Sequence, residues 1–295
     1  MRRRHPTVAL ATCATRPDWE VDDRPLVAAL EAMGARVLEP NWDDPGFRWR
    51  QCDACLIRTT WDYESRRDEY VAWARRVAGQ IPLFNSPEVV EWNTEKGYLR
   101  DLERRGVPII PTLWLPRGAS VDPAALLRER GWWSGFLKPL VGHSAQATLP
   151  FTADAEGLAA ARAHLARHLP ERAMMLQPYL DRVESEGEIS AIFVDGELTH
   201  AVRKVPVPGD YRVQDDYGAT DHPVTLAPAE AELARSIVAA AEADLLYARV
   251  DLLRDEAGEL HLTELELVEP SLFFRHSAAA AERLAEALLT RVTRR

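Results

Sequence analysis

Residues 247–268 contain two runs of side chains that alternate between apolar and polar or charged types. The first run covers residues 247–253, the second covers residues 260–268, and Ala257-Gly258 lies between them. Successive side chains of a β-strand point to opposite faces of its sheet, and a glycine-containing turn joins adjacent antiparallel strands. The pattern therefore predicts a hairpin with one apolar face and one charged face.

The charged face of this hairpin is rich in carboxylates. A turn centred on Ala257-Gly258 places Asp251 opposite Glu264 and Arg249 opposite Glu266. Like charges directly opposite each other destabilise a sheet, and a divalent cation removes that penalty. An all-oxygen ligand set suits magnesium or manganese, so we predict that Asp251, Glu264 and Glu266 bind a metal.

The same residues allow a second interpretation. The hairpin could present a solvated face with an Arg249–Glu266 ion pair, which leaves Asp251 opposite Glu264 without a partner. Glu269 follows the hairpin and is either a further metal ligand or a loop carboxylate.

Predicted strands and helices alternate in the first part of the chain. This order is typical of an open, mostly parallel sheet, and ligands bind at the carboxyl ends of such strands. Residues 58–63 follow one strand and are either a capped loop or a substrate-binding segment. The expected strands are residues 8–14, 36–38 and 54–60, and the expected helices are residues 24–33, 65–78 and 94–105.

Later segments predict a mixture of antiparallel strands and helices. Residues 107–115 are extended and interrupted by prolines, which suits a link between domains. Asp195-Gly196 predicts a tight hairpin turn. The expected strands are residues 135–140, 174–179, 189–194 and 198–205, and the expected helices are residues 156–168, 228–243 and 277–292.

Composition excludes several classes of protein. The chain has 295 residues and a net charge of −10, which argues against a general nucleic-acid binder. It has no apolar run of the roughly 20 residues that a membrane helix needs, so we expect a cytoplasmic protein. Cys52-x-x-Cys55 has no second cysteine pair for a zinc site, and we expect these cysteines to pack in the core.

The three lysines of the chain lie in informative places. Lys138 lies in a buried strand between Leu137 and Pro139, where an unpaired charge is costly and a phosphate would be a suitable partner. Lys96 is expected early in a helix, and Lys204 in a strand. Small residues at 142–145 allow backbone amides to approach a phosphate, although an ordinary turn is equally compatible with them.

These residues together resemble the ATP-grasp superfamily, and the carbon–nitrogen ligases related to glutathione synthetase and ribosomal-protein glutamate ligases are most similar. The resemblance implies an open parallel N-terminal domain, a central lid and a C-terminal antiparallel sheet, with ATP between the last two. It assigns residues 1–94 to the first domain, 95–111 to a linking helix and strand, 112–180 to the lid, and 181–295 to the C-terminal subdomain.

The resemblance also implies roles for individual residues. Lys96 and Lys138 correspond to the two lysines that hold the ATP phosphates, and Glu184 to the acid that binds ribose, with Glu186 and Glu188 as alternatives. The adenine-binding hinge corresponds to Gln177, Pro178, Tyr179 and Leu180. Lys204, Arg212 and Arg249 correspond to basic residues that face the phosphates and the substrate, and Asp251, Glu264 and Glu266 to the metal ligands.

Two departures from the family pattern concern the metal and the phosphate loop. Glu266 stands where many relatives have asparagine, and residues 142–145 contain one glycine. The segment around Glu266 is similar to a branch that includes a cyclo-ligase forming cycloserine from O-ureido-serine.

The implied activity is an ATP- and magnesium-dependent ligase. It activates a carboxylate as an acyl phosphate, an amine attacks, and ADP and phosphate are released. The implied partner is an amino-acid-like small molecule, with no nucleic acid or membrane. The alternatives are an ATP-grasp kinase and a non-catalytic ATP-binding regulator. The substrates, the choice between ring closure and intermolecular ligation, and the choice between monomer and homodimer stay open.

Overall fold

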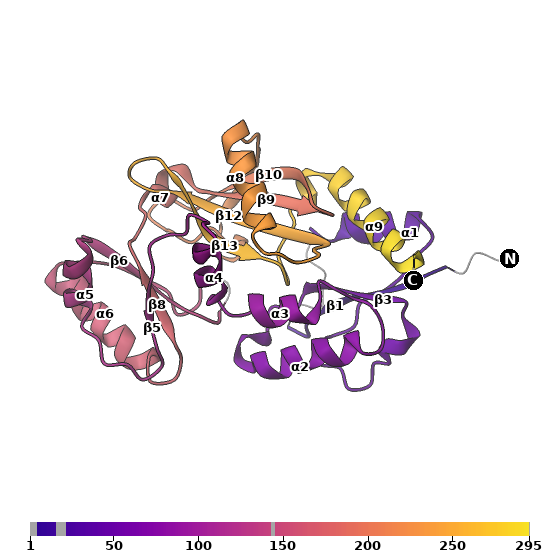
Figure 1. Cartoon of the computed structure of the whole chain (residues 1–295), viewed down its shortest axis with the longest axis horizontal. Coiled ribbons are helices and arrows are strands. Elements are labelled where there is room, and N and C mark those ends of the chain that lie inside the picture. Colours follow the sequence, from indigo (N-terminus) through magenta and orange to yellow (C-terminus); the bar gives the residue numbers. More distant parts are fainter. Residues whose placement is uncertain (1–4, 16–21, 143–144, 295) are drawn as a thin grey trace.

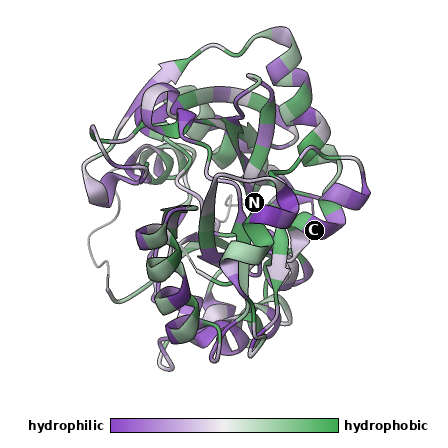
Figure 2. Ribbon diagram, turned by 90° about the vertical axis from the view of Figure 1, so that its left-hand side faces the viewer, coloured by the Kyte–Doolittle hydropathy of each residue, from purple (hydrophilic) through white to green (hydrophobic). Residues whose placement is uncertain are grey.

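The structure, a computed structural model, describes residues 5–15, 22–142 and 145–294. These residues contain one four-stranded parallel sheet, one four-stranded antiparallel sheet and one five-stranded antiparallel sheet. The arrangement confirms the predicted fold class, with a parallel N-terminal sheet followed by antiparallel sheets. Figure 2 shows hydrophobic and hydrophilic patches alternating along the peripheral helices, as expected where each helix buries one side.

The parallel sheet forms the N-terminal domain and has helices on both faces. Its elements are β1 (Thr7–Thr12), α1 (Arg24–Ala32), β2 (Arg36–Leu38), β3 (Ala54–Thr59), α2 (Arg67–Ala78), β4 (Leu83–Phe84) and α3 (Pro87–Asn93), with α9 (Ala278–Thr293) from the end of the chain. Val8 and Leu10 of β1 pack with α1 and α9, whereas Ala9 and Ala11 pack with α2. Figure 1 shows α1 and α9 side by side. The C-terminal helix therefore completes the N-terminal core.

The lid is a separate antiparallel sheet with two helices. Its elements are β5 (Leu113–Leu115), α5 (Pro123–Arg130), β6 (Ser134–Pro139), β7 (Leu149–Thr152), α6 (Ala155–His168) and β8 (Met174–Gln177), and the strand order is β5-β8-β6-β7. Leu127 of α5 and Leu165 of α6 pack against Leu137 and Leu176 of the sheet. In Figure 1 the lid lies at the left, away from both chain ends.

The five-stranded sheet carries the predicted carboxylate hairpin. Its elements are α7 (Arg182–Glu186), β9 (Glu188–Val194), β10 (Glu197–Val205), β11 (Thr220–Val224), α8 (Pro228–Ala239), β12 (Tyr247–Arg254) and β13 (Leu260–Glu266), and the strand order is β11-β10-β9-β12-β13. Asp251 pairs with Glu264 and Arg249 with Glu266, so these two predicted pairings are confirmed, and the register shifts by one residue after Asp251, where Leu252 pairs with Leu262.

The predicted helix over residues 94–105 is wrong at its start. Thr94 ends α3, and the next helix, α4 (Tyr98–Arg104), begins after Gly97. Lys96 therefore lies in the turn between two helices, where its backbone N–H donates to the carbonyl of Leu140. This contact with the lid fixes the turn, and no local sequence pattern indicates it.

Two simpler predictions have clear outcomes. Cys13, Cys52 and Cys55 are buried free thiols, which confirms that the cysteines pack in the core. In the part of the chain that the structure describes, no helix is both long enough and apolar enough to cross a membrane.

Residues 267–271, which we call the strap, join the C-terminal sheet to the N-terminal domain. They leave β13 without regular structure, and five successive carbonyl oxygens accept hydrogen bonds from side chains. The donors to carbonyls 267 to 271 are, in order, Asn85, Tyr247, Trp61, Arg58 and Arg249. Side-chain donors thus replace the missing strand partners, and three of them belong to the N-terminal domain.

We expect Asn85→Ala to destabilise the protein. The Asn85 amide donates to the carbonyls of Tyr247 and Leu267 and accepts from the N–H of Leu246, and Asn85 is 1% exposed. Each buried group left unsatisfied costs ~1–3 kcal/mol, so the free energy of unfolding, measured with urea, should fall by about 2–4 kcal/mol. The control Gln80→Ala removes an exposed hydrogen bond within one turn of chain. Equal destabilisation by both changes would contradict this role of Asn85.

Candidate active site

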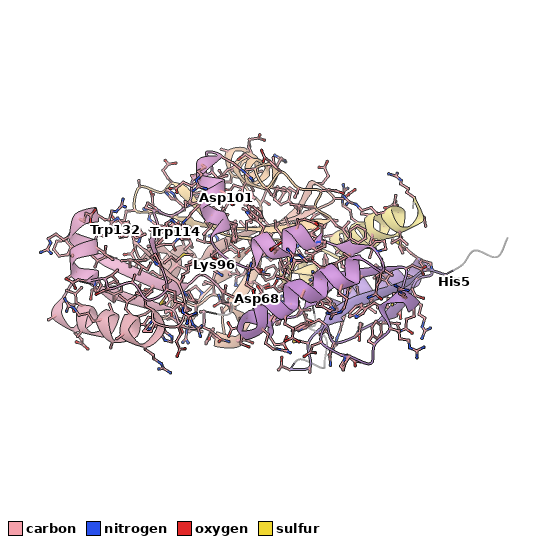
Figure 3. The ribbon with its side chains drawn as sticks, turned by 60° about the horizontal axis from the view of Figure 1, so that its bottom comes forward. His5, Asp68, Lys96, Asp101, Trp114 and Trp132 are labelled. Carbon is pink, nitrogen blue, oxygen red and sulfur yellow. The ribbon has the colours of Figure 1, made fainter. Side chains whose placement is uncertain are left out.

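One cleft is lined by side chains from all three parts of the fold. Trp61 and Tyr63 come from the N-terminal domain, Lys96 and Tyr98 from the connection, and the lid and the C-terminal sheet supply the rest. Figure 3 shows Lys96 between the lid, where Trp114 and Trp132 are labelled, and the N-terminal domain, where Asp68 is labelled. Twelve of the predicted site residues line this cleft, namely Lys96, Lys138, Gln177, Pro178, Tyr179, Leu180, Lys204, Arg212, Arg249, Asp251, Glu264 and Glu266.

Asp251 lies at the centre of the charged part of the cleft. The Arg249 guanidinium donates to both of its oxygens at 2.9–3.0 Å, Ser190 donates at 2.5 Å, and Lys204 Nζ lies 3.4 Å away. Burial alone would raise the pKa of Asp251, but the charges of Arg249 and Lys204 hold it below its ordinary value. The expectation that Asp251 has no partner without a metal is therefore wrong, because two cations already compensate its charge.

Glu264 joins two lysines that are distant in sequence. Lys96 Nζ and Lys138 Nζ each lie 3.4 Å from one of its oxygens. Burial lowers the pKa of Lys138, and the charge of Glu264 only partly opposes this effect. Burial would raise the pKa of Glu264, but the two lysines lower it. The predicted anionic partner of Lys138 is thus present as a carboxylate of the hairpin.

Lys204 is held by a second acidic pair. Its Nζ lies 2.5 Å from Glu188, which also accepts a hydrogen bond from Thr263, and 3.4 Å from Asp251. Burial would lower the pKa of Lys204, but these two carboxylates raise it. Lys96, Lys138 and Lys204 are the three lysines of the chain, and all three line this cleft.

The third predicted metal ligand, Glu266, accepts a hydrogen bond from Arg249. Burial raises the pKa of Glu266 to about 8, the Arg249 charge opposes the shift, and the charges of Asp251 and Glu264 add to it. Within the described residues, no three acidic, imidazole or thiolate side chains already converge as a metal site. The donors nevertheless fit magnesium, because all three are carboxylates on one cleft wall and Glu266 lacks full compensation of its charge.

Aromatic rings form the wall near the predicted adenine-binding segment. Strand β8 ends at Gln177, whose side-chain amide donates to Thr112. Pro178, Tyr179 and Leu180 therefore continue as an irregular segment along the cleft. The rings of Phe136, Tyr179 and Tyr211 pack together, with centroids 5.4–6.3 Å apart. No local sequence pattern indicates Phe136 and Tyr211, because Phe136 belongs to the lid, Tyr211 follows β10 of the C-terminal sheet, and only the fold brings both beside Tyr179.

The three candidates for ribose binding differ in position. Glu184 is exposed, lies outside the described residues that line the cleft, and accepts a hydrogen bond from Tyr179. Glu186 pairs with Arg182. Glu188 lines the cleft but is buried beside Lys204.

Arg212 lines the cleft, as do Gly142 and Ala145 of the predicted phosphate loop. The Arg212 guanidinium pairs with Asp210 and lies 3.9 Å from the centre of the Tyr217 ring, apart from the Arg249 cluster. The hydrogen bonds that the guanidinium donates to Asp210, together with the charge of that carboxylate, raise the pKa of Arg212. Residues 143–144 of the loop lie outside the described residues.

Trp61 and Tyr63 of the N-terminal domain and Glu269 of the strap also line the cleft. Burial raises the pKa of Glu269 to about 7, and a hydrogen bond to the Tyr63 hydroxyl opposes this shift. Burial raises the pKa of Tyr63, and the neighbouring Glu269 charge raises it further. Of residues 58–63, for which the sequence left two interpretations open, Trp61 and Tyr63 line the cleft.

Comparisons with known proteins identify the family. Residues 8–85 match the N-terminal domain of D-cycloserine synthetase DcsG, and residues 129–273 match the ATP-grasp domain of prokaryotic glutathione synthetase. The chain is 31% identical to the cycloserine biosynthesis protein DcsG of Streptomyces lavendulae, over 97% of this chain and 98% of that protein.

Solved structures agree with this assignment. A crystal structure of D-cycloserine synthetase DcsG superposes with a TM-score of 0.87 at 28% identity, covering 97% of this chain and 99% of the other. An ATP complex of D-alanine–D-alanine ligase from Bacillus anthracis, at 15% identity, shares the fold with a TM-score of 0.71, covering 99% of this chain and 98% of the other. The chain therefore belongs to the ATP-grasp family of ATP-dependent ligases, together with DcsG.

Proposed function

We propose that this protein uses ATP to activate the carboxylate of an amino-acid-like substrate and joins it to an amine of the same molecule, as in cycloserine formation. The observation that carries the proposal is the similarity to DcsG over 97% of the chain, combined with the convergence of Lys96 and Lys138 on Glu264. Because the reaction consumes ATP, we place it in the cytoplasm.

The charged cleft suits the chemistry of phosphoryl transfer. A carboxylate is a poor electrophile, and transfer of the γ-phosphoryl group gives it a good leaving group. Lys96, Lys138 and Lys204 supply fixed positive charge where negative charge develops on the phosphate. The amine then attacks the acyl carbon, the carbon–oxygen bond to phosphate breaks, and ADP and phosphate leave.

Other residues receive proposed roles in binding. Gln177, Pro178, Tyr179 and Leu180 would contact adenine, and Glu184 is the proposed ribose ligand, with Glu186 and Glu188 as alternatives. Arg249 and Arg212 would orient the substrate carboxylate, since a guanidinium binds a carboxylate through two hydrogen bonds. Asp251, Glu264 and Glu266 would hold magnesium, which neutralises phosphate charge when bound.

We expect Lys138→Ala and Glu264→Ala each to reduce ADP release by at least roughly 100-fold, because each removes one member of the Lys138–Glu264 ion pair at the proposed site of the ATP phosphates. The measurement is magnesium-dependent ADP release with O-ureido-serine, and mass spectrometry identifies a new ring or amide. Arg203→Ala, an exposed neighbour of Lys204, is the control and should retain activity. ADP release that yields a phosphorylated hydroxyl product would instead indicate a kinase.

We expect an amine-specific reagent to inactivate the protein and MgATP to protect it. The chain has three lysines, and all of them line the cleft. Apart from the α-amino group, the reagent can therefore modify the protein only at this site. Peptide mass spectrometry with and without MgATP measures protection at each lysine. Equal labelling of Lys96 and Lys138 in both samples would contradict their role at the phosphates.

We expect Glu266→Gln to raise the magnesium concentration for half-maximal ADP release by roughly tenfold or more, since loss of a metal-site carboxylate weakens metal affinity. The measurement is a magnesium titration at fixed ATP. Glu259→Gln, on an exposed part of the same hairpin, should leave the titration unchanged. An unchanged midpoint in Glu266→Gln would remove Glu266 from the metal site.

A further inference from the structure

Glu269 is a cleft carboxylate to which neither ATP nor magnesium binding assigns a role. It lines the cleft together with Trp61 and Tyr63 of the N-terminal domain. Two residues separate it from Glu266, the last residue of β13, so it belongs to the strap rather than to the strand.

The strap holds Glu269 in a fixed position. The carbonyl of Glu269 accepts from the Trp61 indole at 2.9 Å, and the carbonyls on either side accept from Tyr247 at 2.6 Å and Arg58 at 2.9 Å. Arg58 is itself 1% exposed and paired with Asp23. A binding group held by such surrounding hydrogen bonds is preorganised for its ligand.

The charge of Glu269 is not compensated by an ion pair among the described residues. The nearby cations have other partners, because Lys96 contacts Glu264 and the Gly142 carbonyl, and Arg249 contacts Asp251 and Glu266. Tyr63, which favours the ionised form of Glu269, carries no charge of its own that would compensate the carboxylate. Glu269 is half-buried, and a partly desolvated carboxylate without an ion pair favours a cationic ligand.

We propose that Glu269, positioned by Tyr63 and the strap, binds the α-ammonium group of the substrate. This inference rests on the proposed function and specifies the substrate as an α-amino acid. The substrate carboxylate then points toward Arg249 and the three lysines, and its ammonium points toward Glu269, Trp61 and Tyr63. An ammonium group has no lone pair, so the α-nitrogen stays unreactive and a different nitrogen of the substrate closes the ring.

Glu269 as a further metal ligand is the competing assignment. It lies in the strap, outside the strands that carry the three predicted ligands, and Trp61 and Arg58 of the N-terminal domain donate to its own carbonyl and to the next one. A metal ligand affects the magnesium requirement, whereas an ammonium-binding residue affects discrimination between substrates with and without the amino group. These two effects can be measured separately.

The test compares binding of O-ureido-serine with binding of its deamino analogue, in which hydrogen replaces the α-ammonium group. Serine and 3-hydroxypropanoate form a second pair. Calorimetry is performed with the full chain, magnesium and a non-hydrolysable ATP analogue, so the result does not depend on turnover. The wild-type protein should prefer the ammonium compounds by roughly tenfold or more, as expected for a hydrogen bond to a charged group.

Glu269→Gln should reduce this preference to within about twofold, while affinity for the ATP analogue and the magnesium midpoint stay unchanged. Tyr63→Phe should reduce it partly, because the carboxylate remains. The exposed Glu259→Gln control should retain the full preference.

Three results would overturn the assignment. The first is a wild-type protein that shows no preference for the ammonium compounds, which includes a protein that binds neither member of a pair. The second is a Glu269→Gln protein that keeps the preference. The third is a Glu269→Gln protein in which only the magnesium midpoint changes. Failure of ring formation with preserved ammonium preference would instead reject the proposed reaction and leave the ammonium site in place.

Discussion

Compensation of the buried charge on Asp251 organises the candidate site. Asp251 is 2% exposed, and an isolated carboxylate at that depth would be strongly destabilising. Its partners Arg249, Ser190 and Lys204 come from β12, β9 and β10, which are adjacent strands. The strand order β10-β9-β12-β13 therefore brings the positive charge of Lys204 on β10 close to the negative charge of Asp251 on β12. A change in strand order would leave Asp251 buried without Lys204.

The hairpin was predictable from sequence because its information is local. Alternating side chains and a glycine-containing turn specify register over a short segment, and the pairings of Asp251 and Arg249 follow directly. The partners of Asp251 were not predictable in the same way. Ser190 and Lys204 lie on strands whose position beside β12 depends on the packing of the whole sheet, so the sequence interpretation wrongly left Asp251 without a partner.

The same distinction explains the other gaps between sequence and structure. Lys96 lies in a turn because Leu140 of the lid accepts its N–H, and Tyr211 reaches the cleft wall because Thr148 and Phe136 lie beside it. The strap is irregular and has no period that a sequence pattern could display. Its conformation depends on side-chain donors up to 212 residues away in the chain. Element types were therefore more predictable than the contacts that complete the site.

The cleft contains two kinds of cationic side chain, lysine and arginine, and they differ in how firmly they are held. The chain contains 36 basic residues, of which three are lysines, and all three lysines line the cleft. A lysine ammonium is a compact charge on a flexible stem, so it can exchange a carboxylate partner for a phosphate oxygen. Arg249 has a planar guanidinium that holds Asp251, Glu266 and the Ser271 carbonyl at once. Exchangeable lysines beside the fixed Arg249 let the cleft accept the charge of ATP while Asp251 keeps a permanent partner.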